Sequence, residues 1–168
     1  LDSFVLYGFH KFVLCINYKS EIIKSYFKEM KRYLVSFSKE NKPLGTVGGI
    51  KKINFHKEKN IIVTNCDGIF DINFESLMDF HLKSNSQITL VASRKNIKIP
   101  YGVCQLGKSK NTLKNISEKP SMDFLVNTGL YVIKSEIIKL IPKNKHFDFT
   151  DLLLKAKKNR KKISVFPI

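Results

Sequence analysis

The sequence predicts an α/β fold with three layers, in which helices cover both faces of a mostly parallel sheet that carries an antiparallel insertion. Short apolar runs without strict alternation recur along the chain, as in 61–64 (IIVT) and 88–93 (ITLVAS), and such runs are typical of strands covered on both faces. Segments with helical spacing of apolar residues separate them. This β–α–β order favours parallel pairing with right-handed crossovers, a Rossmann-like arrangement.

The first part of the chain follows this order. Residues 12–18 (FVLCINY) are expected to form a buried strand. Ser20 is placed to cap a helix over about 20–33, because apolar residues recur there at helical spacing. A short strand over 35–37 follows. Residues 40–50 (ENKPLGTVGGI) are then expected to form a loop, since glycines let the backbone approach a ligand closely, with a helix starting near 46 and running toward 55.

Three signals organise the middle of the chain. Asn73 is expected to cap a helix that ends near 85, with His81 as a packed core histidine. The strand over 88–93 comes next. Residues 101–120 are expected to form an antiparallel hairpin with its turn at 107–111, because glycine and asparagine interrupt short strands there.

The last quarter is predicted to hold four elements: a strand over 130–133, a short helix over 135–140 capped by Ser135, a helix over 148–157 capped by Thr150 or Asp148, and a strand over 163–166. Pro142 prevents a longer helix after 140.

Composition limits the class of protein. The 168 residues are enough for one domain with a core. Thirty Lys and Arg against 14 Asp and Glu give a net charge of +16, which would suit a nucleic-acid or phosphate-rich partner. The alternative is that a general bias of the composition toward Lys, Asn, Ile and Phe produces this net charge without any such partner. Nucleic acid is disfavoured, because the aromatic residues follow buried periodic patterns and the densest basic run, 155–162, resembles a solvated helix end.

Cellular location follows from the cysteines and from hydropathy. Cys15, Cys66 and Cys104 are scattered, with neither disulfide nor metal-ligand spacing, so a reducing cytoplasm is expected. No apolar run approaches the ~20 residues that span a bilayer, so no membrane partner is expected. Residues 1–12 do not form a signal peptide, because polar and charged residues interrupt them.

The strongest candidate site lies in 61–70 (IIVTNCDGIF). Asp67 follows the strand over 61–64 and precedes Gly68, where such a strand leaves the sheet. Ligands of open α/β sheets bind at this carboxyl-end edge, so Asp67 is placed to hold a cation or a polar ligand. The alternative is an ordinary turn, since Asp-Gly is a common turn pair.

Six short motifs in a fixed order extend this pattern: PLGTVGG at 43–49, NCDG at 65–68, YGV at 101–103, EKP at 118–120, NTGLYVI at 127–133 and FDFTDLL at 147–153. Together they resemble the sugar-1-phosphate nucleotidyltransferase family, and most nearly its mannose-1-phosphate and glucosamine-1-phosphate guanylyltransferase-like members. The resemblance implies the nucleotide-diphospho-sugar transferase fold. It also implies magnesium-dependent transfer of a nucleotidyl group from a nucleoside triphosphate to a sugar 1-phosphate, with release of pyrophosphate.

The resemblance implies roles for single residues. Asp67 would be catalytic by holding Mg²⁺, which prefers one or two carboxylates together with phosphate oxygens. Lys119 would be catalytic by pairing with the sugar phosphate, and Glu118 would accept hydrogen bonds from sugar hydroxyls. The sugar pocket would be completed by Gly102, Asn127 and Thr128. For Glu118 and Lys119 the alternative is an ordinary surface pair before a turn.

Residues 40–46 resemble the base-binding loop of the family, and the implied nucleotide-binding residues are Glu40, Leu44, Gly45 and Thr46. An ionised carboxylate only accepts hydrogen bonds. Guanine offers two adjacent donors, whereas uracil and thymine offer one donor flanked by acceptors. Glu40 therefore favours GTP, unless it is a solvated loop residue.

The chain departs from the family in two respects. It has no glycine-rich loop with arginine (GxGTR) to hold the triphosphate, and it has no tryptophan, so the motif with the second metal aspartate is missing. We therefore expect residues 1–168 to be a single nucleotidyltransferase domain truncated at both ends. One alternative is a non-catalytic nucleotide-sugar-binding or regulatory domain, and another is a basic nucleic-acid-binding protein. The assembly state stays open, a homo-oligomer included.

Overall fold

The central sheet has the strand order β3–β7–β4–β8 in the computed structural model, which describes residues 1–55, 58–109 and 111–168. Three of its strands run parallel: β3 (Asn60–Thr64), β4 (Ile88–Lys98) and β8 (Ile163–Pro167). β7 (Ser121–Lys134) lies between β3 and β4 and is antiparallel to both. The sheet therefore joins a parallel framework to one long reversed strand.

Two smaller sheets accompany it. β1 (Lys11–Ile16) and β2 (Leu34–Lys39) form a parallel pair, and β5 (Val103–Leu106) and β6 (Leu113–Ser117) form an antiparallel pair. The predicted α/β class and the antiparallel insertion are confirmed. The single sheet that we expected is divided, because no ladder joins β1 to β3 in the described residues.

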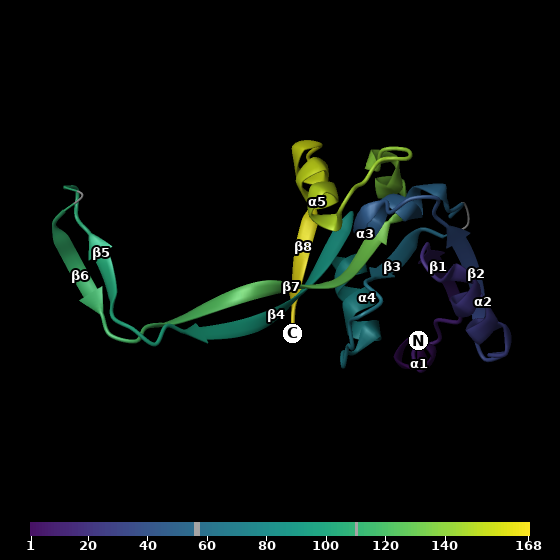
Figure 1. Cartoon of the computed structure of the whole chain (residues 1–168), viewed down its shortest axis with the longest axis horizontal. Helices are drawn as coiled ribbons and strands as arrows, with labels where there is room; N and C mark the ends of the chain where they lie inside the picture. Colours follow the sequence, from purple (N-terminus) through teal and green to yellow (C-terminus); the bar gives the residue numbers. More distant parts are fainter. Residues whose placement is uncertain (56–57, 110) are drawn as a thin grey trace.

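The three layers are confirmed by two separate cores on the two faces of the central sheet. In β7, Tyr131 and Ile133 pack into one core, and Leu130 and Val132 pack into the other, as the two-residue period of a strand requires. Figure 1 shows the helices on both sides. One face is covered by α3 (Gly45–Gly48), η1 (Gly49–Lys52), η2 (Ser135–Leu140) and α5 (Phe149–Lys158), and the other by α1 (Asp2–Val5) and α4 (Phe74–Lys83).

Two helix starts agree with the sequence prediction. Asn73 caps α4, because its Oδ1 accepts a hydrogen bond from the Ser76 N–H at 2.8 Å. Asp148 is the N-cap of α5, which resolves the choice between Asp148 and Thr150, and its N–H donates to Asp151 Oδ2 at 3.1 Å. Side-chain oxygens at such positions satisfy backbone donors that the helix leaves free.

Other predictions about helices are wrong. Ser20 is not a cap: Lys19 occupies that position with a φ of 52°, and Ser20 begins α2 (Ser20–Lys28). This helix ends well before 33, where Tyr33 is buried and donates to Asp2 Oδ1 at 2.6 Å. Ser135 does not cap η2, which follows Lys134 and is a 3₁₀ helix. The helix expected over 46–55 is instead one α-turn followed by η1.

The insertion is larger than predicted. β4 continues to Lys98 and β7 begins at Ser121, so both strands leave the body as a two-stranded ribbon that ends in β5 and β6 (Figure 1). We call residues 93–126 the arm. The predicted hairpin is confirmed in β5 and β6, and residue 110 of its turn lies outside the described residues. No helix in the described part of the chain has the length and hydropathy to cross a membrane.

His81 is a buried core histidine, as predicted. Its Nδ1 lies 2.7 Å from Thr89 Oγ1, and its Nε2 lies 3.3 Å from Asn60 Oδ1. Burial, and then the positive charge of Lys134, lower the pKa of His81 from its ordinary value of 6.5. The folded protein therefore holds this ring in its neutral form.

The buried ring makes stability depend on pH. Below pH 6.5 the unfolded chain protonates His81 while the folded chain still does not, so stability is full above that pH and falls as the pH drops. We expect the melting temperature of the native protein to fall between about pH 7.5 and pH 5.5, and that of His81→Gln to change less. Thermal unfolding at both pH values measures this. Equal slopes for the two proteins would contradict the assignment.

Candidate active site

The NCDG and NTG motifs lie in direct contact. The Asn65 N–H donates to the Gly129 carbonyl at 3.1 Å. Gly129 has a φ of +79°, and a Cβ added to it would lie 2.7 Å from Asn65 Nδ2. A glycine is therefore needed for both the backbone conformation and the space. Asp67 follows in an exposed turn, three residues beyond the last residue of β3.

Asn127 and Thr128 are fixed by hydrogen bonds at the base of the arm. Asn127 Oδ1 accepts from the Gly129 N–H at 3.0 Å, and Asn127 Nδ2 donates to Tyr131 Oη at 2.6 Å. Thr128 Oγ1 donates to the Val91 carbonyl at 2.9 Å. Both side chains are therefore positioned by the body, beside Asn65 and the turn that carries Asp67.

An aromatic pair connects this corner to the glycine loop. The rings of Tyr131 and Phe149 stack with their centroids 3.4 Å apart and their planes at 6°. Burial raises the pKa of Tyr131, and the hydrogen bond from Asn127 partly offsets it. The phenol stays protonated at neutral pH and serves as a fixed support for the Asn127 side chain.

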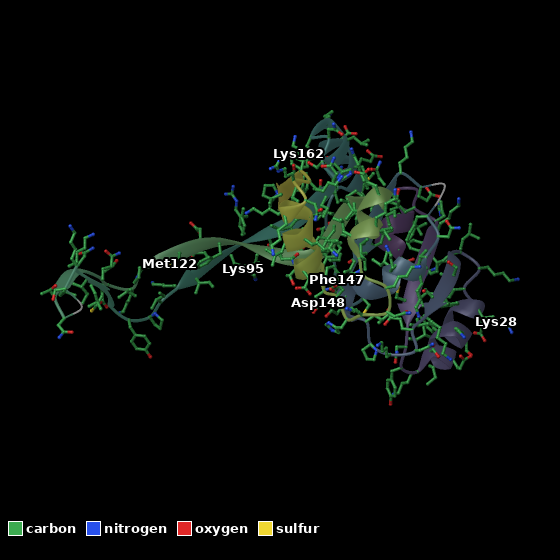
Figure 2. All side chains as sticks on the ribbon, turned by 90° about the horizontal axis from the view of Figure 1, so that it is seen from above. Lys28, Lys95, Met122, Phe147, Asp148 and Lys162 are labelled. Carbon is green, nitrogen blue, oxygen red and sulfur yellow. The ribbon has the colours of Figure 1, made fainter. Side chains whose placement is uncertain are left out.

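The PLGTVGG loop is held by the FDFTDLL segment. The Thr46 N–H donates to Asp148 Oδ1 at 2.9 Å, and Thr46 Oγ1 accepts from the Phe149 N–H at 2.8 Å. Gly45 has a φ of +79°, and a Cβ there would lie 2.7 Å from Asp148 Oδ1. The Phe147 N–H donates to the Leu44 carbonyl at 2.8 Å. Figure 2 shows Phe147 and Asp148 side by side at the foot of α5.

Glu40 is folded onto its own loop. Its Oε2 accepts from the Leu44 N–H at 3.2 Å, and a Cβ on Gly49 would overlap its Oε1. The thiol of Cys15 lies on the same side of Gly49. Burial, and then the negative charge of Glu40, raise the pKa of Cys15 to about 11, although part of the Cys15 side chain reaches solvent. Glu40 is therefore a positioned carboxylate rather than a freely solvated one.

The remaining predicted residues lie partway along the arm, where the ribbon of β4 and β7 meets the hairpin of β5 and β6. A Cβ on Gly102 would lie 3.1 Å from Glu118 Oε2, so the YGV and EKP motifs meet. Lys119 Nζ is 3.9 Å from Glu118 Oε1, and a φ of 45° at Lys119 turns the chain from β6 toward β7. All three residues are exposed.

The structure therefore groups the predicted residues into two sets. The ladder from Ala92↔Asn127 to Lys98↔Ser121 runs through seven pairs without a register shift, which is about 20 Å at the rise of a β-strand. Gly102, Glu118 and Lys119 lie beyond its outer end, away from the body. Two open hollows lie along α2, and neither is lined by a predicted site residue. The residues that the resemblance assigns to one sugar pocket are therefore separated in this arrangement, with Asn127 and Thr128 on the body and Gly102 on the arm.

Sequence reasoning gave no role to four residues that organise the body side of the site: Asn65, Gly129, Tyr131 and Phe149. Each lies inside a recognised motif, so the signal was present. Their contacts cross long sequence distances, as between Thr46 and Phe149, and a single sequence does not display such pairs.

A magnesium ion fits the turn at Asp67 only with help from phosphate oxygens. Within residues 1–55, 58–109 and 111–168, no three His, Cys, Asp or Glu side chains gather to hold a metal ion. Its own segment of the chain carries no Lys or Arg between Lys59 and Lys83. One carboxylate with phosphate oxygens and water is a common magnesium environment.

An α/β sheet that is covered by helices on both faces and carries a glycine loop and an exposed aspartate turn is an architecture found among nucleotide-binding proteins. The sequence profile of the Nucleotidyl transferase family matches residues 1–166, and the chain belongs to this family.

Its relatives include enzymes named mannose-1-phosphate guanyltransferase. The protein of Debaryomyces hansenii is 32% identical over 151 residues, which cover 84% of this chain and 41% of the relative. The protein of Saccharomyces cerevisiae is 31% identical over 144 residues, which cover 80% of this chain and 40% of the relative. The chain thus matches about two fifths of the length of these relatives.

Solved structures share the fold. HddC from Yersinia pseudotuberculosis has a TM-score of 0.72 at 23% identity, with 98% of this chain and 72% of HddC covered. The inositol-1-phosphate CTP transferase from T. maritima has a TM-score of 0.64 at 16% identity, with 98% of this chain and 69% of the transferase covered. These likenesses confirm the predicted nucleotide-diphospho-sugar transferase fold.

The contact between Glu40 and Cys15 can be tested by thiol reactivity. Removing the carboxylate in Glu40→Gln should lower the pKa of Cys15, since the negative charge opposes thiolate formation. We expect alkylation of Cys15 near pH 8.5 to become roughly threefold faster or more, because the thiolate is the reactive form. Peptide mass spectrometry measures the rate, with Glu118→Gln on the arm as the control. An unchanged rate in Glu40→Gln would contradict the geometry.

Proposed function

We propose that this chain is a nucleotidyltransferase domain that forms a nucleoside-diphosphate sugar from GTP and a sugar 1-phosphate, with release of pyrophosphate. One observation carries the proposal. Hydrogen bonds and ring stacking link the glycine loop, the NTG corner and the aspartate turn into one network on the body. The relatives' names make mannose 1-phosphate the first sugar phosphate to test.

The nucleotide side of the proposed site is the loop that contains Glu40, Leu44, Gly45 and Thr46. Glu40 uses one carboxylate oxygen to hold the Leu44 N–H. Its lone pairs still allow it to accept hydrogen bonds from a base. Guanine presents two adjacent donors to such an acceptor, so GTP is the favoured nucleotide.

The sugar side is divided between the body and the arm. Asn127 and Thr128 belong to the body, where their hydrogen bonds fix them. Gly102, Glu118 and Lys119 belong to the arm, where the ribbon of β4 and β7 meets the hairpin of β5 and β6. When this part of the arm lies against the turn that carries Asp67, Lys119 would neutralise the sugar phosphate and Glu118 would accept hydrogen bonds from sugar hydroxyls.

The chemistry is an in-line substitution. A phosphate oxygen of the sugar 1-phosphate attacks the α-phosphorus, the new P–O bond forms, and the bond to the β-phosphate oxygen breaks as pyrophosphate leaves. Such a reaction depends on positioning and on neutralisation of phosphate charge. Asp67 is the residue that would hold Mg²⁺, which supplies that neutralisation when bound.

The surroundings of the reaction follow from the same reading. The proposed reaction takes place in the cytoplasm, where nucleoside triphosphates and sugar phosphates are found. A reducing cytoplasm also agrees with the three free cysteines. The competing proposal is a binding or regulatory domain that keeps the pocket without turnover. Thermal stabilisation by GTP without pyrophosphate release would select that alternative.

Removal of the Asp67 carboxylate is the direct test. In Asp67→Asn we expect pyrophosphate release from GTP and mannose 1-phosphate to fall roughly 100-fold or more, since a lost metal ligand removes several kcal/mol of charge stabilisation. A coupled phosphate assay across Mg²⁺ concentrations measures turnover.

Asp71→Asn is the matched control, because it removes another exposed carboxylate four residues away and should retain activity. Thermal unfolding checks that both variants fold. Undiminished turnover in Asp67→Asn would rule out this residue as the metal ligand, and no turnover of any triphosphate by the native protein would reject the proposed function.

Base choice tests Glu40 separately. In Glu40→Gln the amide oxygen can still accept from the Leu44 N–H, but the amide nitrogen now donates toward the base. We expect kcat/KM for GTP to fall about 10- to 100-fold, which corresponds to one charged hydrogen bond, with a smaller change for UTP, CTP and dTTP. Steady-state kinetics with all four nucleotides measures the ratio. An unaltered preference would remove Glu40 from base recognition.

A further inference from the structure

One of the two hollows along α2 lies between this helix and β2, and we call it the α2 hollow. Its volume is about 410 Å³, which falls within the roughly 300–1,000 Å³ of small-molecule sites. Figure 2 shows Lys28, one of its lining residues, at the end of the body opposite the arm. The α2 hollow is therefore separate from every residue that the proposed function uses.

An aromatic cluster forms one side of the α2 hollow. The ring centroid of Phe27 on α2 lies 6.3 Å from that of Tyr33 and 6.4 Å from that of Phe37 on β2. The hydroxyl of Tyr33 donates to Asp2 Oδ1 at 2.6 Å, which fixes that ring. Val35 and Phe37 line the hollow from one face of β2, as the two-residue period of a strand requires. Packing thus sets the positions of the rings before any ligand binds.

The charged residues of α2 are divided between its two sides. Lys24, Lys28 and Lys31 line the α2 hollow, and no Asp or Glu does. The other hollow is lined by Glu21 and Glu29 and by no Lys or Arg, and helical spacing places the two sets on opposite sides of the helix. Lys24 donates to Glu21 at 2.9 Å, whereas Lys28 and Lys31 form no ion pair in the described part of the chain.

Two unpaired lysines beside an aromatic surface indicate the chemistry of a ligand. Like charges that are close along a helix repel each other, so an anion that lies between Lys28 and Lys31 would be attracted by both. Aromatic side chains stack with the flat face of any nucleobase. A nucleoside phosphate carries both groups in one molecule. Inorganic phosphate and sugar phosphates offer only the anion, and they would leave the aromatic side of the hollow uncovered.

We propose that the α2 hollow is a second nucleotide site, which binds a nucleoside phosphate with its base against Phe27 and Phe37 and its phosphate beside Lys28 and Lys31. The loop of the proposed active site begins at Glu40, after the carboxyl end of β2, whereas the α2 hollow lies on a face of that strand. The inference rests on the lining of the hollow and not on the proposed function.

Photolabelling locates the bound base. The protein is irradiated with 8-azido-GMP in the absence of Mg²⁺ and is then digested with trypsin. Cleavage after Arg32 and Lys39 releases residues 33–39, which line the hollow, apart from the loop over 40–50. We expect label on 33–39, and we expect unlabelled GMP to remove it at roughly tenfold lower concentration than ribose 5-phosphate, which has no base to stack.

Three results of this experiment would overturn the proposal. Label confined to the peptide that contains 40–50 would mean that the nucleotide binds only at the loop. Equal competition by GMP and ribose 5-phosphate would mean that the lysines attract any phosphate. Removal of the label by single-stranded RNA far more effectively than by GMP would mean that the hollow takes a nucleic acid.

A matched pair of double substitutions tests the lysines. Lys28→Gln with Lys31→Gln removes the two unpaired charges of the hollow, and Lys157→Gln with Lys158→Gln removes two exposed charges from α5. We expect the first pair to weaken GMP binding at 33–39 about tenfold, because two charged contacts to the phosphate are lost, and the second pair to leave it unchanged.

The concentration of 8-azido-GMP that half-saturates the label on 33–39 measures this affinity. Both double variants keep Arg32 and Lys39, so trypsin releases the same peptide from each. Thermal unfolding checks that both variants fold. Equal effects of the two pairs on the label would overturn the proposal.

The outcomes separate this site from the proposed function. Label on 33–39 in a protein that releases no pyrophosphate would reject the proposed function and keep the α2 hollow as a nucleotide site. A protein that forms a nucleoside-diphosphate sugar but takes label only at 40–50 would reject the α2 hollow and keep the proposed function.

Discussion

The site depends on one backbone conformation, the left-handed turn of Gly129 inside β7. The φ of +79° is one that side chains other than glycine rarely adopt, and an added Cβ would lie 2.7 Å from Asn65 Nδ2. Because β7 turns here, its register against β4 shifts between Leu90 and Ala92. The turn also lets Asn127 Oδ1 accept the Gly129 N–H at 3.0 Å. A single glycine therefore joins the segment that leads to Asp67 to the Asn127 side chain, close to the point where the arm begins.

The inner part of β7 connects the two halves of the body. Tyr131 faces the core that contains α5, where it stacks on Phe149, and Leu130 faces the core that contains α4. Phe149 begins α5, and its N–H donates to Thr46 Oγ1 in the glycine loop. The loop, the strand and the corner thus share one rigid support, so local changes at any of them are transmitted through packing and not only through hydrogen bonds.

Sequence alone predicted what local physics decides. Asn73 as a cap, the buried His81 and the strand before Asp67 each follow from propensity or periodicity within a few residues. We predicted that this strand ends at Ser93 because its apolar run stops there, but β4 continues to Lys98. Its outer residues are exposed to solvent, so the sequence shows no alternation of buried and exposed side chains that would identify them as a strand. The caps at Ser20 and Ser135 failed because the preceding lysines occupy those positions. The distance between Asn127 and Glu118 depends on the ladder register, which periodicity does not specify.

The two sets of predicted site residues differ in what positions them. Asn127, Thr128 and Thr46 are held by part-buried hydrogen bonds and by a ring stack, so their geometry is set before any ligand binds. Lys119 Nζ lies 3.9 Å from Glu118 Oε1 and both side chains are largely in solvent, and such exposed pairs contribute about 0–1 kcal/mol. A pair this weak does not fix two long side chains against a phosphate. Any order that this pair takes must come from the ligand or surface that covers it, whereas the fold alone orders Asn127, Thr128 and Thr46.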